Sequence, residues 1–298
     1  MSIEIKNLNY IHSIEGESFG IKDFNLKIDD GDFIAIVGPT GAGKTTFITH
    51  LNGLVSATSG SIIVDGKNIY DKDYDLKSLR FKVGLAFQYS ENQLFEETVL
   101  SDVAFGAINR LEYEDEAKNI KIKKDKKYKE EINNKAKEIA KRSLSLLGID
   151  ESYYEKSPFL LSGGEKKKVA IAGILAMEPK YLVLDEPTSS LDIESKYEIF
   201  DILKKENEKG KTIIVVSHDI DMVSKYAKKI LYIKDGKQIM YGNINDVYKK
   251  LYQDDNEFGN DIFPQTITLC KMLKENGIAI ENPPLTEEEF VNTIIDYV

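Results

Sequence analysis

The sequence has a single cysteine and no long run of apolar residues. Cys270 is the only cysteine in 298 residues, so no disulfide can form within the chain, which fits a reducing cytosol. The longest apolar run, residues 169–177, is far shorter than the roughly 18 residues that a membrane-spanning helix needs. Residues 1–5 lack the basic and then apolar pattern of a secretory signal. We therefore expect the chain to stay outside the bilayer and Cys270 to be an inert packing residue.

An excess of positive charge is absent as well. The chain carries 40 Lys and Arg against 50 Asp and Glu, a net charge of −10, so its overall charge does not favour nonspecific binding to nucleic acid. A hydrophobic content of 42% and a charged content of 30% are ordinary for a soluble globular protein. At this length the chain can form one or two domains with a proper core.

A glycine-rich motif lies between a predicted buried strand, residues 33–37, and the predicted start of a helix, residues 45–51. It fits the P-loop pattern G-x-x-x-x-G-K-[ST], in which successive backbone N–H groups turn toward phosphates. We expect Lys44 to reach the β- and γ-phosphates of ATP and the Thr45 hydroxyl to bind Mg²⁺. The nucleotide-binding residues predicted here are Gly38, Pro39, Thr40, Gly41, Ala42, Gly43, Lys44, Thr45 and Thr46.

A second apolar strand, predicted over residues 181–184, ends in two carboxylates. With a P-loop upstream in the same chain, Asp185 and Glu186 form the Walker B pattern. We expect Asp185 to hold Mg²⁺, directly or through water. Glu186 is expected beside the γ-phosphate, where it can polarise the attacking water.

Ser162-Gly163-Gly164 lies between these motifs, just before an apolar helix predicted over residues 166–177. Free amides and a hydroxyl at a helix N-terminus suit an anion. Alone, the tripeptide also fits a flexible loop that enters a helix. Its position between the P-loop and Walker B closely resembles the ATP-binding cassette (ABC) superfamily over residues 1 to about 242.

That resemblance implies an α/β fold and a dimer. The expected domain, residues 1–242, has a P-loop NTPase (RecA-like) core, an antiparallel β-subdomain and an inserted helical subdomain at about 89–161. Residues 243–298 are expected to form a small C-terminal helical extension. In the implied head-to-tail dimer, the P-loop of one subunit and the Ser162-Gly163-Gly164 loop of the other enclose each ATP.

Other residues match positions of the ABC family. Gln88 matches the glutamine that senses Mg²⁺ and the membrane partner, and Asp192 matches the aspartate that crosses the dimer interface. His218, after the predicted strand 212–216, matches the switch histidine that contacts the γ-phosphate. The family position of the ring that stacks on adenine corresponds to Tyr10 or His12. Glu165 stands where the family commonly has glutamine, a change that should not abolish ATP binding.

Two stretches, 87–99 and 169–179, more narrowly resemble ATPases of energy-coupling factor (ECF) transporters, and the chain looks like the second of their two paired ATPases. The tail resembles the extension that strengthens the ATPase dimer in that family. This resemblance implies a peripheral subunit at the cytoplasmic face of the cell membrane. Its expected partners are a second ABC ATPase in a homo- or heterodimer, a transmembrane coupling protein and a substrate-binding membrane subunit, which together import vitamins or transition-metal ions.

Three alternatives compete with an ECF-type importer. A conventional ABC importer or exporter is disfavoured by residues 87–99 and by the tail. A soluble ABC protein acting on DNA or the ribosome usually has two cassettes or a long coiled coil. Here one P-loop, no sustained heptad run and the net charge of −10 argue against a nucleic-acid partner. A small-molecule kinase is disfavoured by Ser162-Gly163-Gly164 and by His218.

Local patterns predict the ends of several elements. Hairpins are expected at 61–69 and 230–241, and turn residues at 12–20. Helices are expected after Thr98 as N-cap, over residues 132–147 before Gly148, and over 246–252 after Asn245. In the tail, a helix is expected over 266–276, and Thr286-x-x-Glu289 is a capping box. The lysine-rich run 118–129 is interpreted as a solvated loop or helix face, with a phospholipid contact as the alternative. The tail helices are too small to fold alone and should pack on the main domain or on a partner.

Overall fold

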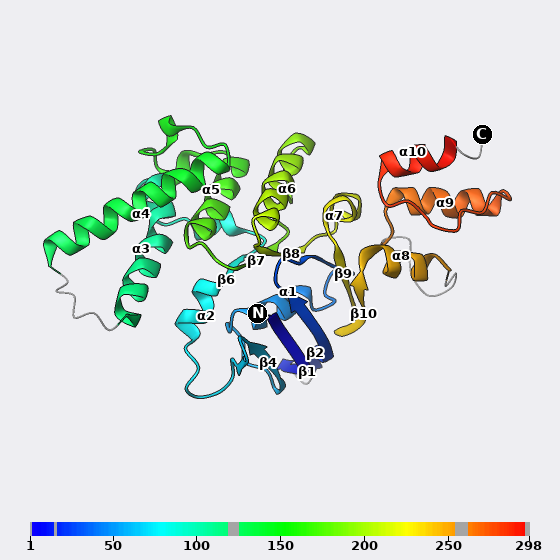
Figure 1. Cartoon of the computed structure of the whole chain (residues 1–298), viewed down its shortest axis with the longest axis horizontal. Coiled ribbons are helices and arrows are strands. Elements are labelled where there is room, and N and C mark those ends of the chain that lie inside the picture. Colours follow the sequence, from blue (N-terminus) through cyan, green and yellow to red (C-terminus); the bar gives the residue numbers. More distant parts are fainter. Residues whose placement is uncertain (1, 15–16, 119–124, 254–261, 296–298) are drawn as a thin grey trace. The chain divides into compact units, whose positions relative to one another are not determined.

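The computed structural model describes residues 2–14, 17–118, 125–253 and 262–295. The chain divides into two compact units. Unit 1 combines Met1–Tyr74 with Thr212–Val298, and unit 2 is Asp75–Lys211. Figure 1 shows the elements of both units. The boundary expected at residue 242 remains a prediction.

Unit 1 contains a mixed sheet in the strand order β5-β4-β1-β2-β10-β9-β3-β8. Strand β1 is antiparallel to β2 and β4, whereas β3 is parallel to β8 and β9. Every residue of β3 and of β8 is buried, as expected for a continuous apolar run inside a parallel sheet. The strands are β1 (Ser2–Ile14), β2 (Glu17–Asp29), β3 (Phe33–Val37), β4 (Ser59–Val64), β5 (Lys67–Asn68), β8 (Thr212–Val216), β9 (Lys229–Lys234) and β10 (Lys237–Asn243).

Both predicted hairpins are confirmed. The β4–β5 turn is Asp65-Gly66, with φ of 54° and 80°, and the β9–β10 turn is Asp235-Gly236, with φ of 49° and 70°. Two successive positive φ angles define the type I′ turn, whose twist matches that of the flanking strands.

The turn predicted over residues 12–20 is wrong in extent. Strand β1 continues to Ile14, β2 begins at Glu17, and His12 pairs with Phe19 across the ladder. Cross-strand pairing provides backbone hydrogen-bond partners for residues 12–14 and 17–20, although several of these residues are typical of turns. Strands β2 and β3 follow each other in the chain but are not neighbours in the sheet, because β10 and β9 lie between them.

Two helices of unit 1 begin beside its parallel strands. Helix α1 (Lys44–Leu51) follows β3 and packs on β2, where the Phe24 and Phe47 rings stack at 5.0 Å between centroids. Helix α7 (Ile220–Tyr226) follows β8 and has Asp219 as its N-cap. Both helices therefore begin where a parallel strand has just ended.

Unit 2 pairs two parallel strands, β6 (Val83–Ala86) and β7 (Tyr181–Asp185), with a group of helices. Helices α3, α4 and α5 pack against one another. The packing of α3 is close at Gly106, where a Cβ atom would lie 2.7 Å from Met177 Cγ. The helices are α2 (Leu76–Lys82), α3 (Val99–Ala117), α4 (Lys126–Leu146), α5 (Gly163–Ala176) and α6 (Ile193–Glu208), with short 3₁₀ turns at Ser90–Gln93, Glu151–Tyr153 and Pro158–Leu160.

The predicted ends of α3 and α4 are confirmed. Thr98 and Ser101 form a reciprocal capping box at the start of α3. Gly148, with φ of 70°, follows α4, and the next residue, Ile149, donates its N–H to the Leu144 carbonyl. Of the lysine-rich run, residues 119–124 lie outside the described residues.

The tail continues unit 1 with α8 (Ile244–Gln253), α9 (Gln265–Glu275) and α10 (Glu287–Ile295). Helix α8 packs on β9 and β10, which confirms contact between the tail and the main domain. The predicted Asn245 cap is wrong, because Asn243 Oδ1 accepts the Asn245 N–H at 2.9 Å and the helix begins earlier. The Thr286–Glu289 capping box is confirmed.

We expect Thr266→Val to destabilise the tail. The buried Thr266 hydroxyl donates to the Pro284 carbonyl at 2.8 Å, and valine would leave that carbonyl without this donor. The expected loss is about 1–3 kcal/mol, the usual cost of an unsatisfied buried polar group. Urea denaturation and limited proteolysis of the tail would measure it. The matched control is Thr293→Val in α10, whose hydroxyl bonds at an exposed position. Equal stability of the two variants would contradict the prediction.

Candidate functional site

The P-loop joins β3 to α1 through three glycines with positive φ. These angles are 146° at Gly38, 78° at Gly41 and 100° at Gly43. A Cβ atom on Gly38 would lie 1.9 Å from the Ile233 carbonyl oxygen, so only glycine fits there. Gly43 is the N-cap residue of α1 and has no side chain to cover the helix end. The N-terminus of α1 therefore has the form of a phosphate-binding site.

Lys44 is buried, and its ammonium is held by the loop itself. Its Nζ donates to the carbonyls of Gly38 and Pro39 at 2.7 and 2.8 Å. Thr45, the next residue of α1, is exposed. The cation and the hydroxyl thus lie at the start of one helix, where the helix dipole also favours an anion.

His218 leaves the sheet beside the P-loop. Strands β3 and β8 are parallel neighbours in which Ile36 pairs with Val216. The Ser217 N–H donates to the Ile36 carbonyl at 3.3 Å, and the exposed His218 follows. Unit 1 therefore brings the predicted switch histidine and the P-loop to the carboxyl ends of adjacent strands.

Three rings connect the predicted adenine site to the P-loop helix. The Tyr10 and His12 rings on β1 are nearly parallel, with 7° between planes and 6.3 Å between centroids. The Tyr10 ring meets the His50 ring of α1 edge-on at 5.0 Å. Burial lowers the pKa of His50, and His50 Nδ1 lies 2.7 Å from the Thr46 carbonyl, so a neutral ring donates there. The sequence analysis did not identify His50, because no local pattern shows that a single histidine in a helix contacts a ring on a distant strand.

Unit 2 brings Gln88, Asp185 and Glu186 to one edge of its strand pair. Ala86 and Leu184 are paired in the parallel ladder of β6 and β7, so both polar segments leave at the same end. Asp185 and Glu186 are buried, and Glu186 has a φ of 51°, unusual for a residue with a side chain. Carboxylate and amide oxygens at this edge are ligands that Mg²⁺ prefers.

The Ser162-Gly163-Gly164 segment opens α5 through a capping box with Glu165. The Ser162 N–H donates to Glu165 Oε2 at 2.8 Å, and the Glu165 N–H donates to Ser162 Oγ at 3.3 Å. Hydrogen bonds from the Ser162 hydroxyl and backbone lower the pKa of Glu165. Since glutamine can close the same box, the glutamate keeps the local fold.

The loop between β7 and α6 ends in a second cap. Asp192 Oδ1 accepts the Ser195 N–H at 2.8 Å, and Oδ2 accepts the Ser195 hydroxyl at 2.9 Å. Backbone and side-chain bonds from Ser195 lower the pKa of Asp192. Within the same loop, Ser189 is bonded to the buried Lys167 of α5. The sequence did not single out Lys167, because two neighbouring lysines hide it.

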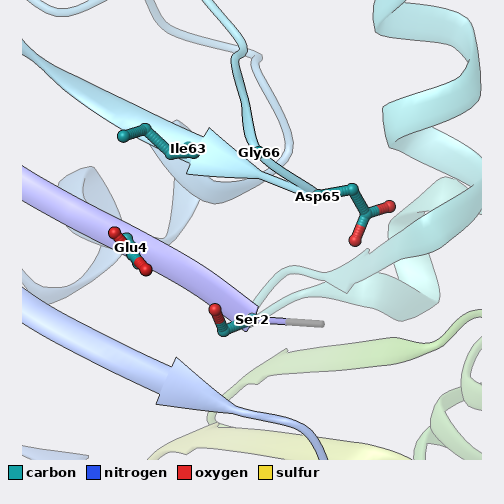
Figure 2. Close-up of a pocket in the computed structure, with 5 residues that line it drawn as sticks. All are labelled: Ser2, Glu4, Ile63, Asp65 and Gly66. Atoms are coloured by element: carbon teal, nitrogen blue, oxygen red, sulfur yellow. The ribbon is translucent and has the colours of Figure 1, made fainter.

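A pocket of about 360 Å³ lies elsewhere on unit 1. It is lined by Ser2, Glu4, Ile63, Asp65 and Gly66. Figure 2 shows Ser2 and Glu4 on β1, and the Asp65 carboxylate pointing away from Glu4. Glu4 lies six residues before Tyr10 on the same strand, about 20 Å away at 3.3 Å per residue. This pocket is therefore separate from the predicted adenine site.

None of the helices in the described part of the chain combines the length and apolarity of a membrane-spanning segment.

The family model for "ABC transporter" matches residues 21–189. Two of the similar relatives are energy-coupling factor transporter ATP-binding proteins EcfA2. The one from Clostridium perfringens is 41% identical and aligns over 100% of this chain and 99% of its own length. The one from Clostridium tetani is 42% identical and aligns over 97% and 94%.

Solved structures agree. The cbiO1 protein from Clostridium perfringens, described as part of the ABC transporter complex cbiONQ, is 34% identical, with a TM-score of 0.67 and coverage of 90% of this chain and 98% of its own. The cassette MJ0796, a dimer in a post-hydrolysis state bound to ADP and Pi, is 31% identical, with a TM-score of 0.67 and coverage of 81% and 98%. The chain therefore belongs to the ATP-binding proteins of the ABC transporter family, within the group of energy-coupling factor transporter ATP-binding proteins.

Proposed function

We propose that this chain is the ATP-hydrolysing motor subunit of an ECF-type importer. The observation that carries the proposal is the similarity to an EcfA2 protein over the whole chain, including the tail beyond residue 242. The complete set of cassette motifs supports it. The reaction is hydrolysis of ATP to ADP and phosphate, coupled to transport.

The proposed nucleotide site takes its phosphate contacts from unit 1. Backbone N–H groups of residues 38–46, apart from Pro39, which has none, bind the phosphates together with the Lys44 ammonium, as the positive φ angles and the start of α1 favour. Thr45, Gln88 and Asp185 each offer an oxygen atom, a donor set that fits Mg²⁺. When bound, this ion neutralises charge on the β- and γ-phosphates.

Hydrolysis is assigned to Glu186 and His218. Glu186 orients the attacking water and accepts its proton, and His218 contacts the γ-phosphate as charge develops there. In the proposed head-to-tail dimer, the amides of Gly163 and Gly164 and the Ser162 hydroxyl approach the ATP of the partner subunit, and Asp192 lies at the interface.

A membrane partner is proposed to dock on the segment after Gln88. Phe95 and Phe105 are 58% and 45% exposed and contact edge-to-face at 5.0 Å. Asp102 Oδ2 accepts the N–H groups of Phe95 and Glu96 at 2.8 and 2.9 Å, which fixes the segment. A fixed, exposed aromatic pair suits an apolar partner surface. We assign this pair to a transmembrane coupling protein and propose that the chain lies at the cytoplasmic face of the membrane.

The cargo is proposed to bind a separate membrane subunit and to be a vitamin or a transition-metal ion. A second cassette ATPase completes the dimer, and the tail strengthens it. ATP binding closes the dimer and moves the membrane partner, and hydrolysis reopens it.

Glu186→Gln is expected to bind ATP but to stop turnover. The amide cannot accept the proton of the attacking water, so kcat should fall by about 10²-fold or more. Phosphate release and the ATP-dependent mass of the dimer would be measured, with Glu208→Gln at the exposed end of α6 as the charge-matched control. Near-normal turnover by a homodimer of Glu186→Gln subunits would rule out the proposed role.

The exposed His12 ring is proposed to stack on adenine, with Tyr10 as its support. His12→Ala should then weaken ATP binding by about 1–3 kcal/mol, the usual loss when a stacking ring is removed. Tyr10→Phe should bind normally. Ile11→Ala is the control, because neighbouring strand residues face opposite sides of the sheet. Titration of a fluorescent ATP analogue would measure these three variants and Tyr10→Ala. Normal binding by His12→Ala together with weak binding by Tyr10→Ala would reassign the stacking ring to Tyr10.

Affinity purification from mildly solubilised membranes tests the partners. We expect the tagged chain to recover a second cassette ATPase, a multi-span coupling protein and varied small membrane subunits, whose identities would name the cargo. Phe95→Ser with Phe105→Ser should lose the membrane proteins but keep the second ATPase. Leu54→Ser, which changes another exposed apolar residue of the chain, is the control. Recovery of soluble partners alone would refute the importer assignment.

A further inference from the structure

Lys167 is a buried cation that joins α5 to the loop after Glu186. Lys167 is only 4% exposed. Its Nζ donates to the Ser189 carbonyl and to the Ser189 hydroxyl, each at 2.8 Å. Burying an ammonium is costly unless fixed acceptors surround it. The two oxygen atoms of Ser189 therefore hold Lys167 to one place in the loop.

The loop of residues 186–192 needs such support. Glu186 and Ser190 both have positive φ, at 51° and 64°. Two turns shape the loop, in which the Ser189 N–H donates to the Glu186 carbonyl at 3.2 Å and the Leu191 N–H donates to the Thr188 carbonyl at 3.3 Å. Left-handed backbone at residues with side chains persists where the surroundings enforce it. Lys167 bonds to the residue that also closes the turn on Glu186.

Two more contacts fix the same loop and its following helix to α5. A Cβ atom built on Gly164 would lie 3.2 Å from Leu191 Cδ2, so Leu191 lies close to the first turn of α5. Lys168 Nζ forms an ion pair with Glu198 of α6 at 2.6 Å. All of these residues belong to unit 2. The segment 162–168 is thus connected to the loop 186–192 at Ser189 and Leu191, and to the following helix at Glu198.

We propose that Lys167 is a positioning residue that couples the two ATP sites of the dimer. In one chain, the Ser162-Gly163-Gly164 segment meets the ATP of the partner, whereas Glu186 acts on the ATP of its own P-loop. Lys167 lies between them and transmits the position of the segment, through Ser189, to the backbone that carries Glu186. Engagement of one ATP thereby orients the carboxylate that hydrolyses the other. This inference depends on the dimer of the proposed function.

The experiment measures ATP binding and hydrolysis by the purified transporter complex. Lys167→Met keeps much of the side-chain volume and removes the donor. Its Kd for ATP should stay within about twofold of that of the unsubstituted complex, because the P-loop is unchanged. Its kcat should fall by about 10- to 100-fold, as for a slightly displaced reacting group. The Hill coefficient for ATP should fall toward 1. Lys167→Arg, which retains a cationic donor, should recover most of both values.

Two further variants separate coupling from general damage to the fold. Ser189→Ala removes one of the two acceptors and leaves Lys167 in place, so it should give an intermediate loss of kcat and of cooperativity. Lys204→Met on the exposed face of α6 removes a lysine charge from the same unit and should match the unsubstituted complex.

Unchanged kcat and Hill coefficient in both Lys167→Met and Ser189→Ala would overturn the inference. So would a loss of ATP binding and thermal stability in parallel with kcat, since that pattern marks a purely structural role. A complex of unsubstituted subunits that does not hydrolyse ATP would instead refute the proposed function, and this result is seen before any variant is compared.

Discussion

Parallel strand pairing is the constraint on which the predicted site depends. Within a parallel ladder, neighbouring strands end at the same edge, so the loops that follow them leave side by side. In unit 1 this rule brings the P-loop after β3 next to His218 after β8. In unit 2 it brings Gln88 after β6 next to Asp185 and Glu186 after β7. Residues more than 90 positions apart in the chain thus become neighbours through backbone hydrogen bonds that are independent of their side chains.

The sequence predicted those features that a short stretch of residues specifies alone. The P-loop pattern requires glycine where the backbone φ is positive, and Gly38, Gly41 and Gly43 all have positive φ. Both Asp-Gly hairpins and the Thr98 cap follow the same logic, because the side chain and the turn that it favours are adjacent. The β3, β7 and β8 strands were predictable because continuous apolar runs indicate burial on both faces.

The features that could not be predicted from the sequence arise from contacts between distant residues. Lys167 and Ser189 are 22 positions apart, and only the packing of α5 beside the loop makes them partners. His50 supports Tyr10 across a helix and a strand that no local pattern relates. The turn predicted over residues 12–20 was too long for the same reason, since the ladder of β1 and β2 includes residues that are typical of turns. Such pairings become apparent once the strand order is known.

Several residues of the predicted site, or next to it in the chain, also hold its backbone in place. Ser162 caps α5 while its segment is proposed to approach the partner's ATP, Asp192 caps α6 at the proposed interface, and Asp219, beside His218, caps α7. A capping side chain is bonded to the first turn of its helix, so its position follows the helix that it caps. The two loops of unit 2 are in turn joined by Lys167. A shift of α5 would therefore move Ser162 and, through Ser189, the turn on Glu186 together, which is how a rigid helix can connect ATP binding to catalysis without a flexible element between them.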